Sequence, residues 1–279
     1  MKKWISKNIA QASHFLVAAA LLVVTSLVVS CKKDDAKQAS TTSGAASSIG
    51  PTKLSVSDSE PRAIIEGDDK SIIMIKGFGF NTDPNKNMVT IGDRVATVVD
   101  AGIDYLQVKV PAGLPANDYT ITVVTNSQKN AAAFLFVLNK NDVNQVKAFF
   151  DQNIDGKSNG EKIVEAKITN FNPNNLTTWL SGSVTNFETN NGGRLIYFSL
   201  PKKIKLAGAL NLKGCSKLED VHVNNQDLTS IDLTGASENL KLSCKGNQLK
   251  SITLSHPLKD KSNINPQQAE HPDVVIIVK

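Results

Sequence analysis

The run from residue 151 to residue 162 has the spacing of a calcium-binding loop, with glycine at position 6. Its oxygen donors lie at positions 1, 3, 5 and 9 and next to position 12: Asp151, Asn153, Asp155, Asn159 and Glu161. Position 12 requires a bidentate carboxylate but holds Lys162, which would place an ammonium group there. The sequence leaves two interpretations open, a calcium site and a polar connector, and favours the connector.

The other reactive side chains do not predict catalysis. Asp220 and His222 could supply two metal ligands, but a site needs a third. The sequence contains no Gly-x-Ser-x-Gly, His-Glu-x-x-His, Cys-x-x-Cys or phosphate-loop motif. Carboxylates that meet only in three dimensions stay open as an alternative. We therefore expect a binding protein that is not an enzyme and has no cofactor unless calcium binds.

The first 30 residues have the layout of an export signal. Three lysines and no acidic residue precede an apolar run from Phe15 to Val29. This run is shorter than the roughly 20 residues that a membrane-spanning helix needs. It ends at Ser30-Cys31, which resembles the lipobox of bacterial lipoproteins. The resemblance implies that Cys31 becomes the acylated, palmitate-bearing first residue of the mature chain. An ordinary cleaved signal and a short anchor helix are the alternatives.

The residues after Cys31 indicate a tether at the cell surface. Lys32-Lys33-Asp34-Asp35 resembles a surface-export tag of lipoproteins from one Gram-negative phylum. Residues 32–50 are mostly Ser, Thr, Ala, Gly and charged residues, which cannot bury enough apolar area to fold. We expect a protein anchored by lipid in the outer membrane and exposed at the cell surface.

The charge balance argues against nucleic acid as a partner. Lys and Arg number 31 against 26 Asp and Glu, and removing the three lysines of the signal leaves 28 − 26 = +2. Aromatic residues make up only 5% of the chain, which leaves few platforms on which a ligand could stack.

Residues 51–138 show short segments of period-two alternation separated by Gly, Pro, Asn and Asp, the pattern of a β-sandwich. Four motifs follow one another: Ile75-Lys76-Gly77-Phe78-Gly79-Phe80, Val89-Thr90-Ile91-Gly92, Val108-Lys109-Val110-Pro111 with Gly113, and Tyr119-Thr120-Ile121-Thr122-Val123. They resemble the IPT/TIG family of immunoglobulin-like domains, which implies a spacer or interaction module. We expect Gly77 and Gly79 to lie where a Cβ would clash, and Phe78 or Phe80 to plug one end.

A repeat of 21 residues follows. Residues 210–230 align with residues 231–251, so that Leu212 matches Leu233 and Leu228 matches Leu249, and Ile252 begins another unit. An earlier segment, residues 195–200, aligns with residues 218–223 at a shift of 23. The pattern resembles the leucine-rich repeats of bacterial surface proteins, which implies a short solenoid whose units bury their apolar edges only together.

The repeat register assigns structural roles to several polar residues and thiols. Cys215 and Cys244 fall at core positions and should be buried thiols, with a disulfide between them as the alternative. Asn247 should bond turn backbone groups, a role that Gln226 takes one unit earlier. Trp179 is either a core residue or an exposed contact.

A helix is predicted between the two modules. Asp142 is the expected N-cap, and the apolar residues share one stripe that could cover the open end of the solenoid: Val143, Val146, Phe149 and Phe150.

Alternation along the inner strands predicts which side chains face solvent. One lateral row should contain Tyr197, Asp220 and Lys241, and a second Ser199, His222 and Ser243, with Asn224 and Lys245 beyond them. This is the candidate ligand surface. The alternative is a solvated sheet face with an ion pair between Asp220 and Lys241.

Together these features predict a mainly β protein, an immunoglobulin-like sandwich followed by a short leucine-rich-repeat solenoid with an N-terminal helical cap. The expected boundaries are 1–30 for the lipoprotein signal, 31–50 for the acylated cysteine and tether, 51–138 for the sandwich, 139–189 for the helical cap and irregular entrance, and 190–279 for the solenoid. The leading functional hypothesis is an interaction or adhesion module for an extracellular protein. The alternative is a glycan-binding accessory protein of a polysaccharide-uptake system. A purely structural surface protein is the third possibility.

Overall fold

The computed structural model describes residues 53–167, 169–181, 184–188, 192–257 and 275–279. The predicted signal, Cys31, the surface-export tag and the whole predicted tether lie outside these residues. In the part of the chain that the structure describes, no helix has the length and apolar character needed to cross a membrane.

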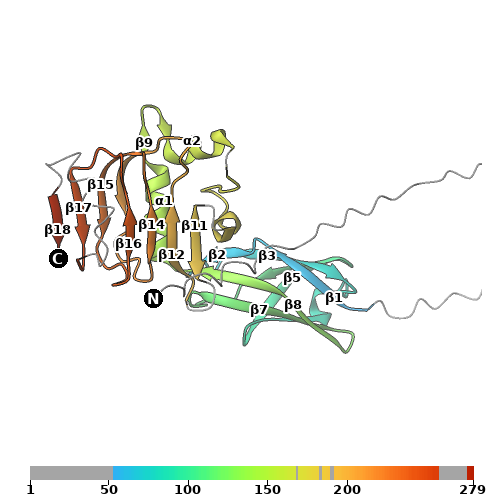
Figure 1. Cartoon of the computed structure of the whole chain (residues 1–279). Coiled ribbons are helices and arrows are strands. Elements are labelled where there is room, and N and C mark those ends of the chain that lie inside the picture. Colours follow the sequence, from blue (N-terminus) through green and yellow to red (C-terminus); the bar gives the residue numbers. More distant parts are fainter. Residues whose placement is uncertain (1–52, 168, 182–183, 189–191, 258–274) are drawn as a thin grey trace, which may run out of the picture. The chain divides into compact units, whose positions relative to one another are not determined.

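Residues 55–138 form a β-sandwich from one sheet that folds over on itself (Figure 1). Its strands are β1 (Ser55–Glu60), β2 (Ala63–Ile65), β3 (Ile72–Phe78), β4 (Asn87–Ile91), β5 (Arg94–Ala101), β6 (Tyr105–Lys109), β7 (Asn117–Thr125) and β8 (Gln128–Leu138), with a 3-10 turn η1 (Pro84–Lys86) before β4. The strand order is β1-β3-β6-β5-β4-β7-β8-β2, and only the β2–β8 pair is parallel.

Alternate side chains of the strands fill the sandwich core, as the period-two pattern predicts. Ile73 and Ile75 of β3 are fully buried. Of the two candidate phenylalanines, Phe80 packs in the sandwich core with 5% of its surface exposed, whereas Phe78 is 63% exposed. A Cβ on Gly77 would collide with the backbone carbonyl of Ser55, and Gly79 has φ +80°. Both glycines are therefore required by the backbone, the first for close approach and the second for its conformation.

Two helices and a hairpin follow the sandwich: α1 (Lys140–Asp151), β9 (Asn153–Ile154), β10 (Lys157–Ser158), α2 (Asn159–Ala166) and then the 3-10 turn η2 (Leu176–Ser181). Helix α1 buries the predicted stripe, including Phe149 and Phe150. The prediction that Asp142 is its N-cap was wrong. Asn139 caps the helix and accepts a hydrogen bond from the Asp142 backbone N–H, at 3.3 Å.

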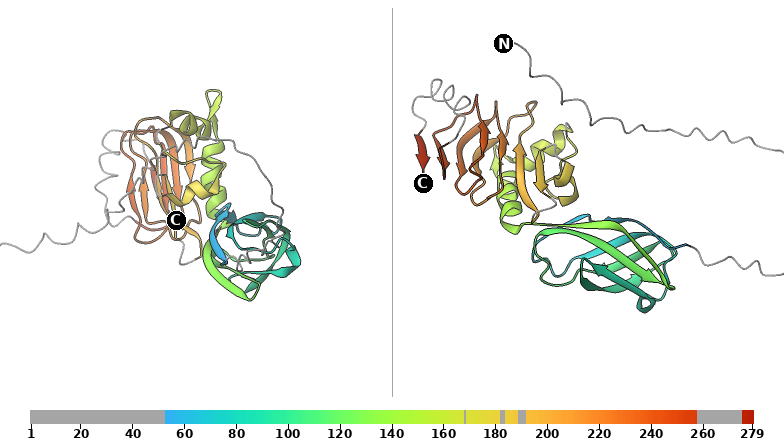
Figure 2. Two further views of the ribbon diagram at one scale, coloured as in Figure 1. Left: turned by 90° about the vertical axis from the view of Figure 1, so that its right-hand side faces the viewer. Right: turned by 60° about the horizontal axis from the view of Figure 1, so that its bottom comes forward.

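The C-terminal region is a β-solenoid-like stack of two sheets, visible as parallel rows of arrows in Figures 1 and 2. The first sheet has the order β11 (Thr185–Glu188), β12 (Arg194–Ser199), β14 (Asp220–His222) and β16 (Lys241–Ser243). The second has the order β13 (Ala207–Asn211), β15 (Asp227–Leu233), β17 (Ser251–Leu254) and β18 (Val275–Val278). All neighbouring strands are parallel except β11 and β12.

The strand register reproduces the repeat read from the sequence. Asp220 pairs with Lys241 and Ile231 with Ile252, both 21 residues apart, while Tyr197 pairs with Asp220 at a separation of 23. The apolar residues of the repeats meet between the two sheets, where Phe198 and Val221 are fully buried. The sequence analysis had anticipated only the first of the two sheets.

Trp179 and the two thiols belong to this core. Trp179 is fully buried and its indole N–H donates to the carbonyl of Asn172 at 3.1 Å, so it is a core residue and not a contact surface. Cys215 and Cys244 are buried free thiols, as the register predicted. Burial raises the pKa of the Cys244 thiol to about 12, and burial chiefly raises that of Cys215 as well.

Candidate ligand-binding face

The outer side of the sheet β11-β12-β14-β16 presents polar side chains in lateral rows, which we call the polar face. In the first row, Tyr197 lies beside Asp220 and Asp220 beside Lys241. In the second row, Ser199 lies beside His222 and His222 beside Ser243. The expected rows are therefore present, because parallel in-register strands stack equivalent residues of successive repeats.

The structure extends the first row by one residue that the sequence analysis missed. Asn186 on β11 pairs with Tyr197 and is half-buried beside it. Strand β11 runs antiparallel to β12 and lies outside the repeat, so the 21-residue period gave no signal for this position. Only the antiparallel register could reveal that Asn186 belongs to the polar face.

Two rings form the centre of the polar face. The ring centroids of Tyr197 and His222 lie 5.6 Å apart, with their planes inclined at 46°. Tyr197 is half-buried and His222 is exposed, so both rings are held by the sheet yet reach solvent. The pair offers two adjacent π surfaces on an otherwise polar face.

The charged groups of the polar face are not neutralised within the protein. Asp220 and Lys241 are lateral neighbours, but neither takes part in an ion pair among the described residues. The expected cross-strand ion pair is therefore not formed. Lys241 and Lys245 are exposed and Asp220 is half-buried. A ligand would meet one carboxylate and two ammonium groups with free hydrogen-bonding capacity.

Asn224 and Ser243 are committed to the sheet itself. The Asn224 side-chain amide donates to Ser243 Oγ at 2.8 Å, and its oxygen accepts from the Lys245 backbone N–H at 2.7 Å. These bonds use both ends of the amide, so Asn224 joins two repeats and is less available to a ligand. Ser243 retains its own hydroxyl proton for donation.

Buried amides beneath the polar face fix the turns between the two sheets. The Asn247 side chain donates to the carbonyls of Val223 and Cys244 and accepts from the Leu228 N–H at 3.1 Å. In the preceding unit, Gln226 accepts from the Leu206 N–H at 2.8 Å. Both side chains are fully buried. Each satisfies turn backbone groups that water cannot reach, which holds the polar face rigid.

A buried ion pair between Asp142 and Arg194 holds β12, the strand that carries Tyr197, against α1. Both Asp142 carboxylate oxygens accept from Arg194 at the start of β12, at 2.8 and 2.9 Å, and one also accepts from the Leu195 N–H at 2.9 Å. The Asp142 side chain is fully buried and that of Arg194 is 22% exposed. This contact ties α1 to the strand that carries Tyr197.

The structure does not bring the five calcium-loop candidates together. They are spread over the end of α1, a hairpin whose turn residues Asp155 and Gly156 both have positive φ, and the start of α2. Asp151 pairs with Lys147, and Glu161 completes a capping box with Ser158. Among the described residues there is no group of three or more side chains arranged to hold a metal ion.

Asn159, another of these candidates, has a different role. Its side chain donates to the carbonyls of Phe149 and Ala207 and accepts from the Ala207 N–H at 3.2 Å. It is fully buried, so it cannot serve as a calcium ligand without breaking these bonds.

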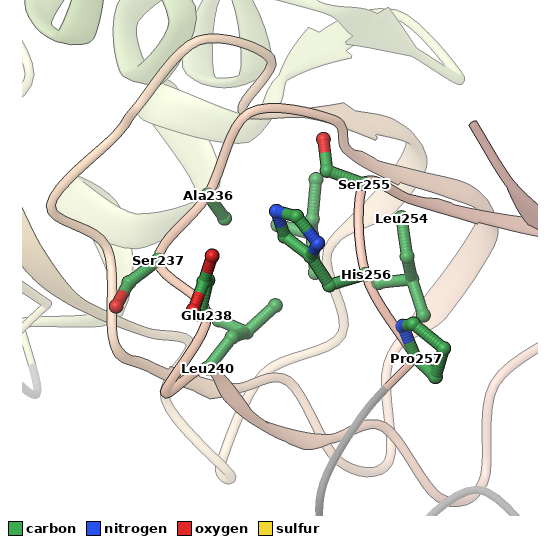
Figure 3. A pocket seen from close by; sticks show the side chains of 9 residues that line it. Ala236, Ser237, Glu238, Leu240, Leu254, Ser255, His256 and Pro257 are labelled. Atoms are coloured by element: carbon green, nitrogen blue, oxygen red, sulfur yellow. The ribbon is translucent and has the colours of Figure 1, made fainter.

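Two hollows lie away from the polar face. The first, of about 10 Å³, is bordered by Glu238 and His256 near the end of β17 and holds no more than about one water (Figure 3). The second, of about 250 Å³, lies beside α2 over Phe150 and Pro173. Its three acidic side chains are already bonded: Asp151 to Lys147 and Glu165 to Lys157, each at 2.7 Å, and Glu161 to the Ser158 N–H at 2.7 Å.

Comparison with known proteins identifies the sandwich. The family model of the IPT/TIG domain matches residues 47–137. The protein contains an IPT/TIG domain. This confirms the resemblance read from the glycine and proline motifs. No curated protein matches the sequence.

Several solved structures resemble part of the chain. An auxiliary nutrient binding protein of Bacteroides ovatus aligns at 22% identity with a TM-score of 0.27, covering 32% of this chain and 21% of its own. Another, from Bacteroides thetaiotaomicron, aligns at 25% identity with the same TM-score and coverage. A putative phosphatase of that organism aligns at 26% identity and TM-score 0.26, covering 30% and 18%. The chain spans about a fifth of the length of these proteins. TM-scores this low carry no argument about what it binds.

Proposed function

We propose that the protein is a surface glycan-binding accessory protein that recognises its ligand on the polar face. The observation that carries the proposal is the Tyr197–His222 ring pair, which lies beside serine hydroxyls and beside Asp220 and Lys241. Neither charged group forms an ion pair with another described residue. Sugars present apolar C–H faces beside many hydroxyl groups. A ring pair bordered by a carboxylate, ammonium groups and serine hydroxyls matches both features.

The composition of the polar face separates a glycan from a protein partner. Interface cores between proteins are enriched in aromatic residues, Met and Arg and are depleted in Lys, Asp and Ser. The rows of the polar face contain one lysine, an aspartate and two serines around one tyrosine and one histidine, and a second lysine, Lys245, lies beyond them. The glycan alternative therefore ranks above the adhesion hypothesis that the sequence had favoured. Two of the similar structures are described as auxiliary nutrient binding proteins, a related class, but the proposal rests on the composition of the polar face.

In this proposal, the remaining parts of the chain hold the polar face at the cell surface. The stack is, in this proposal, a short leucine-rich-repeat solenoid that α1 and α2 cap, because its register repeats every 21 residues and a buried asparagine holds its turn. The IPT/TIG domain serves as a spacer, and acylation of Cys31 anchors the chain in the outer membrane. Catalysis is not part of the proposal, since the polar face offers binding groups without an assembled reactive set.

A glycan array probed with the purified protein tests the proposal. We expect binding to one class of polysaccharide, with affinity about tenfold lower in Tyr197→Ala because one stacking surface is lost. Tyr105→Ala is the matched control, since Tyr105 is a half-buried tyrosine on β6 of the sandwich. Its removal should leave glycan binding unchanged.

Two results would overturn the proposal. One is an array without any bound glycan. The other is glycan binding that Tyr105→Ala weakens as much as Tyr197→Ala does. Capture of an extracellular protein that Tyr197→Ala abolishes would restore the adhesion hypothesis for the same face.

A further inference from the structure

The two edges of the sheet β13-β15-β17-β18 are completed differently. At the first edge, the Gln152 side-chain amide accepts from the Ala209 N–H at 3.0 Å and donates to the Ala209 carbonyl at 2.7 Å. The Asn159 amide bonds the Ala207 N–H and carbonyl in the same way, at 3.2 and 2.9 Å. Two side-chain amides at alternate residues thus replace a neighbouring strand, and β13 has no free edge at these positions.

The opposite edge, β18, has no neighbouring strand among the described residues. The Val275 N–H donates to Lys250 at 3.1 Å and the Lys279 N–H to Leu254 at 2.9 Å, so alternate residues from Val275 onward point their backbone groups toward β17. The N–H and carbonyl groups of Ile276 and Val278 therefore point away from β17. Strand β18 is the last strand of its sheet, and within the described residues no strand pairs with its outer edge.

The side chains of β18 do not protect this edge. Val275, Ile277 and Val278 are 57%, 38% and 49% exposed, respectively. Natural edge strands usually avoid pairing by means of charged residues, proline or a bulge. The strand Val275–Val278 has no charged residue and no proline, and its register with β17 is regular.

We propose that β18 pairs antiparallel with β18 of a second copy of this chain, which makes a closed dimer. The row of free N–H and carbonyl groups is satisfied in full only by another strand, and an uncharged strand meets its own copy without like-charge repulsion. A twofold axis at Ile277 places Ile276 opposite Val278 of the second copy. Both residues have outward-pointing backbone groups, so this register forms four hydrogen bonds.

This register also predicts the size of the assembly. Each β18 has one free edge, and pairing with a second copy uses it completely. The other end of the sheet is completed by Gln152 and Asn159, so no further copy can add there. The assembly stops at two subunits, unlike the open fibres that arise when a sheet has two free edges.

Cysteine cross-linking tests the pairing in the full chain. In the proposed register the two Ile277 residues face each other as a non-hydrogen-bonded pair, with Cα atoms about 4.5 Å apart, a separation that a disulfide spans. Ile277→Cys should therefore give a disulfide-linked dimer under mild oxidation. Val275→Cys is the control, because it is more exposed yet lies about 13 Å from its own copy by strand geometry. No cross-link for Ile277→Cys, or equal cross-linking of the two variants, overturns the proposal.

A second measurement does not depend on a disulfide. Light scattering of the full chain in detergent should give a dimer that dissociates on dilution. Val278→Pro removes one outward N–H from each copy, hence two of four hydrogen bonds, and should weaken the dimer about 25-fold at about fivefold per bond. Circular dichroism must show that this variant stays folded. A monomer at all concentrations, or a dimer that Val278→Pro leaves unchanged, contradicts the pairing.

Discussion

The buried pair between Asp142 and Arg194 gives the sharpest test of how the stack is held together. Asp142→Ala removes the acceptor for two Arg194 N–H groups and for the backbone N–H of Leu195. Leu195 is fully buried, so its N–H has no route to water after the substitution. Arg194 keeps its bond to the Gly214 carbonyl at 2.8 Å but loses its counter-charge.

The expected loss is about 4 kcal/mol of unfolding free energy. A buried N–H left without a partner costs about 1–3 kcal/mol. Breaking a buried ion pair costs about 3–5 kcal/mol, and the 22% exposure of Arg194 places the sum at the low end because water can partly solvate the guanidinium. For a denaturation slope of about 2 kcal/mol/M, the urea midpoint should fall by about 2 M.

Urea unfolding followed by Trp179 fluorescence measures this change, because Trp179 is buried in the same core. Trp4, the other tryptophan of the sequence, lies in the predicted signal, so a chain that begins at Cys31 carries Trp179 as its tryptophan. Asp151→Ala is the matched control, since Asp151 lies on the same helix and its ion pair with Lys147 is exposed. That control should cost less than about 1 kcal/mol. If Asp142→Ala costs no more than Asp151→Ala, the buried pair does not stabilise the stack and the reasoning is wrong.

Two further predictions concern the turns and thiols of the stack. Asn247→Ala leaves the buried Leu228 N–H and two backbone carbonyls without their hydrogen-bond partner, so it should lower the unfolding free energy by about 2 kcal/mol in the same urea assay. A loss below about 0.5 kcal/mol would contradict the role of the buried amide. Burial raises the pKa of Cys244 from 9.0 to about 12, so the unfolded state loses its thiol proton first as the pH rises. The stability that the protonated Cys244 thiol contributes is therefore complete below about pH 9 and is lost between about pH 9 and about pH 12. Cys244→Val should lose less stability than the wild type between pH 8 and pH 10.5, and an identical loss in both would show that the thiol does not titrate on unfolding.

Local sequence patterns were sufficient to predict features that depend on a single backbone position or on a regular repeat. The glycine motifs of the sandwich reflect backbone demands at single positions, so Gly77 could be assigned before its neighbour Ser55 was known. The 21-residue period fixed the lateral rows, because in a stack of equal units the neighbour of each residue is its own equivalent. Burial of Cys215 and Cys244 followed from the same register.

Contacts between distant, non-repeating residues could not be predicted in this way. Asp142 was expected as a helix cap, yet it bonds Arg194, 52 residues away, while Asn139 caps the helix. Asn159 had the spacing of a calcium ligand, but it completes the edge of β13, 48 residues away. Spacing along the chain shows which polar side chains are available. Their hydrogen-bond partners depend on which distant residues the tertiary fold places beside them.

The sequence by itself determined a β-sandwich of the IPT/TIG type, a 21-residue repeat and the order of side chains along the polar face, since these depend on alternation and periodicity. The tertiary structure alone decided that a second sheet closes the stack and that Asn186 joins the polar face. It also decided that Asp220 and Lys241 form no ion pair within the described residues, and that β18 is the last strand of its sheet there. The physical reason is that hydrogen-bond and charge satisfaction is settled by distances between strands and side chains, and no pattern within one strand specifies those distances.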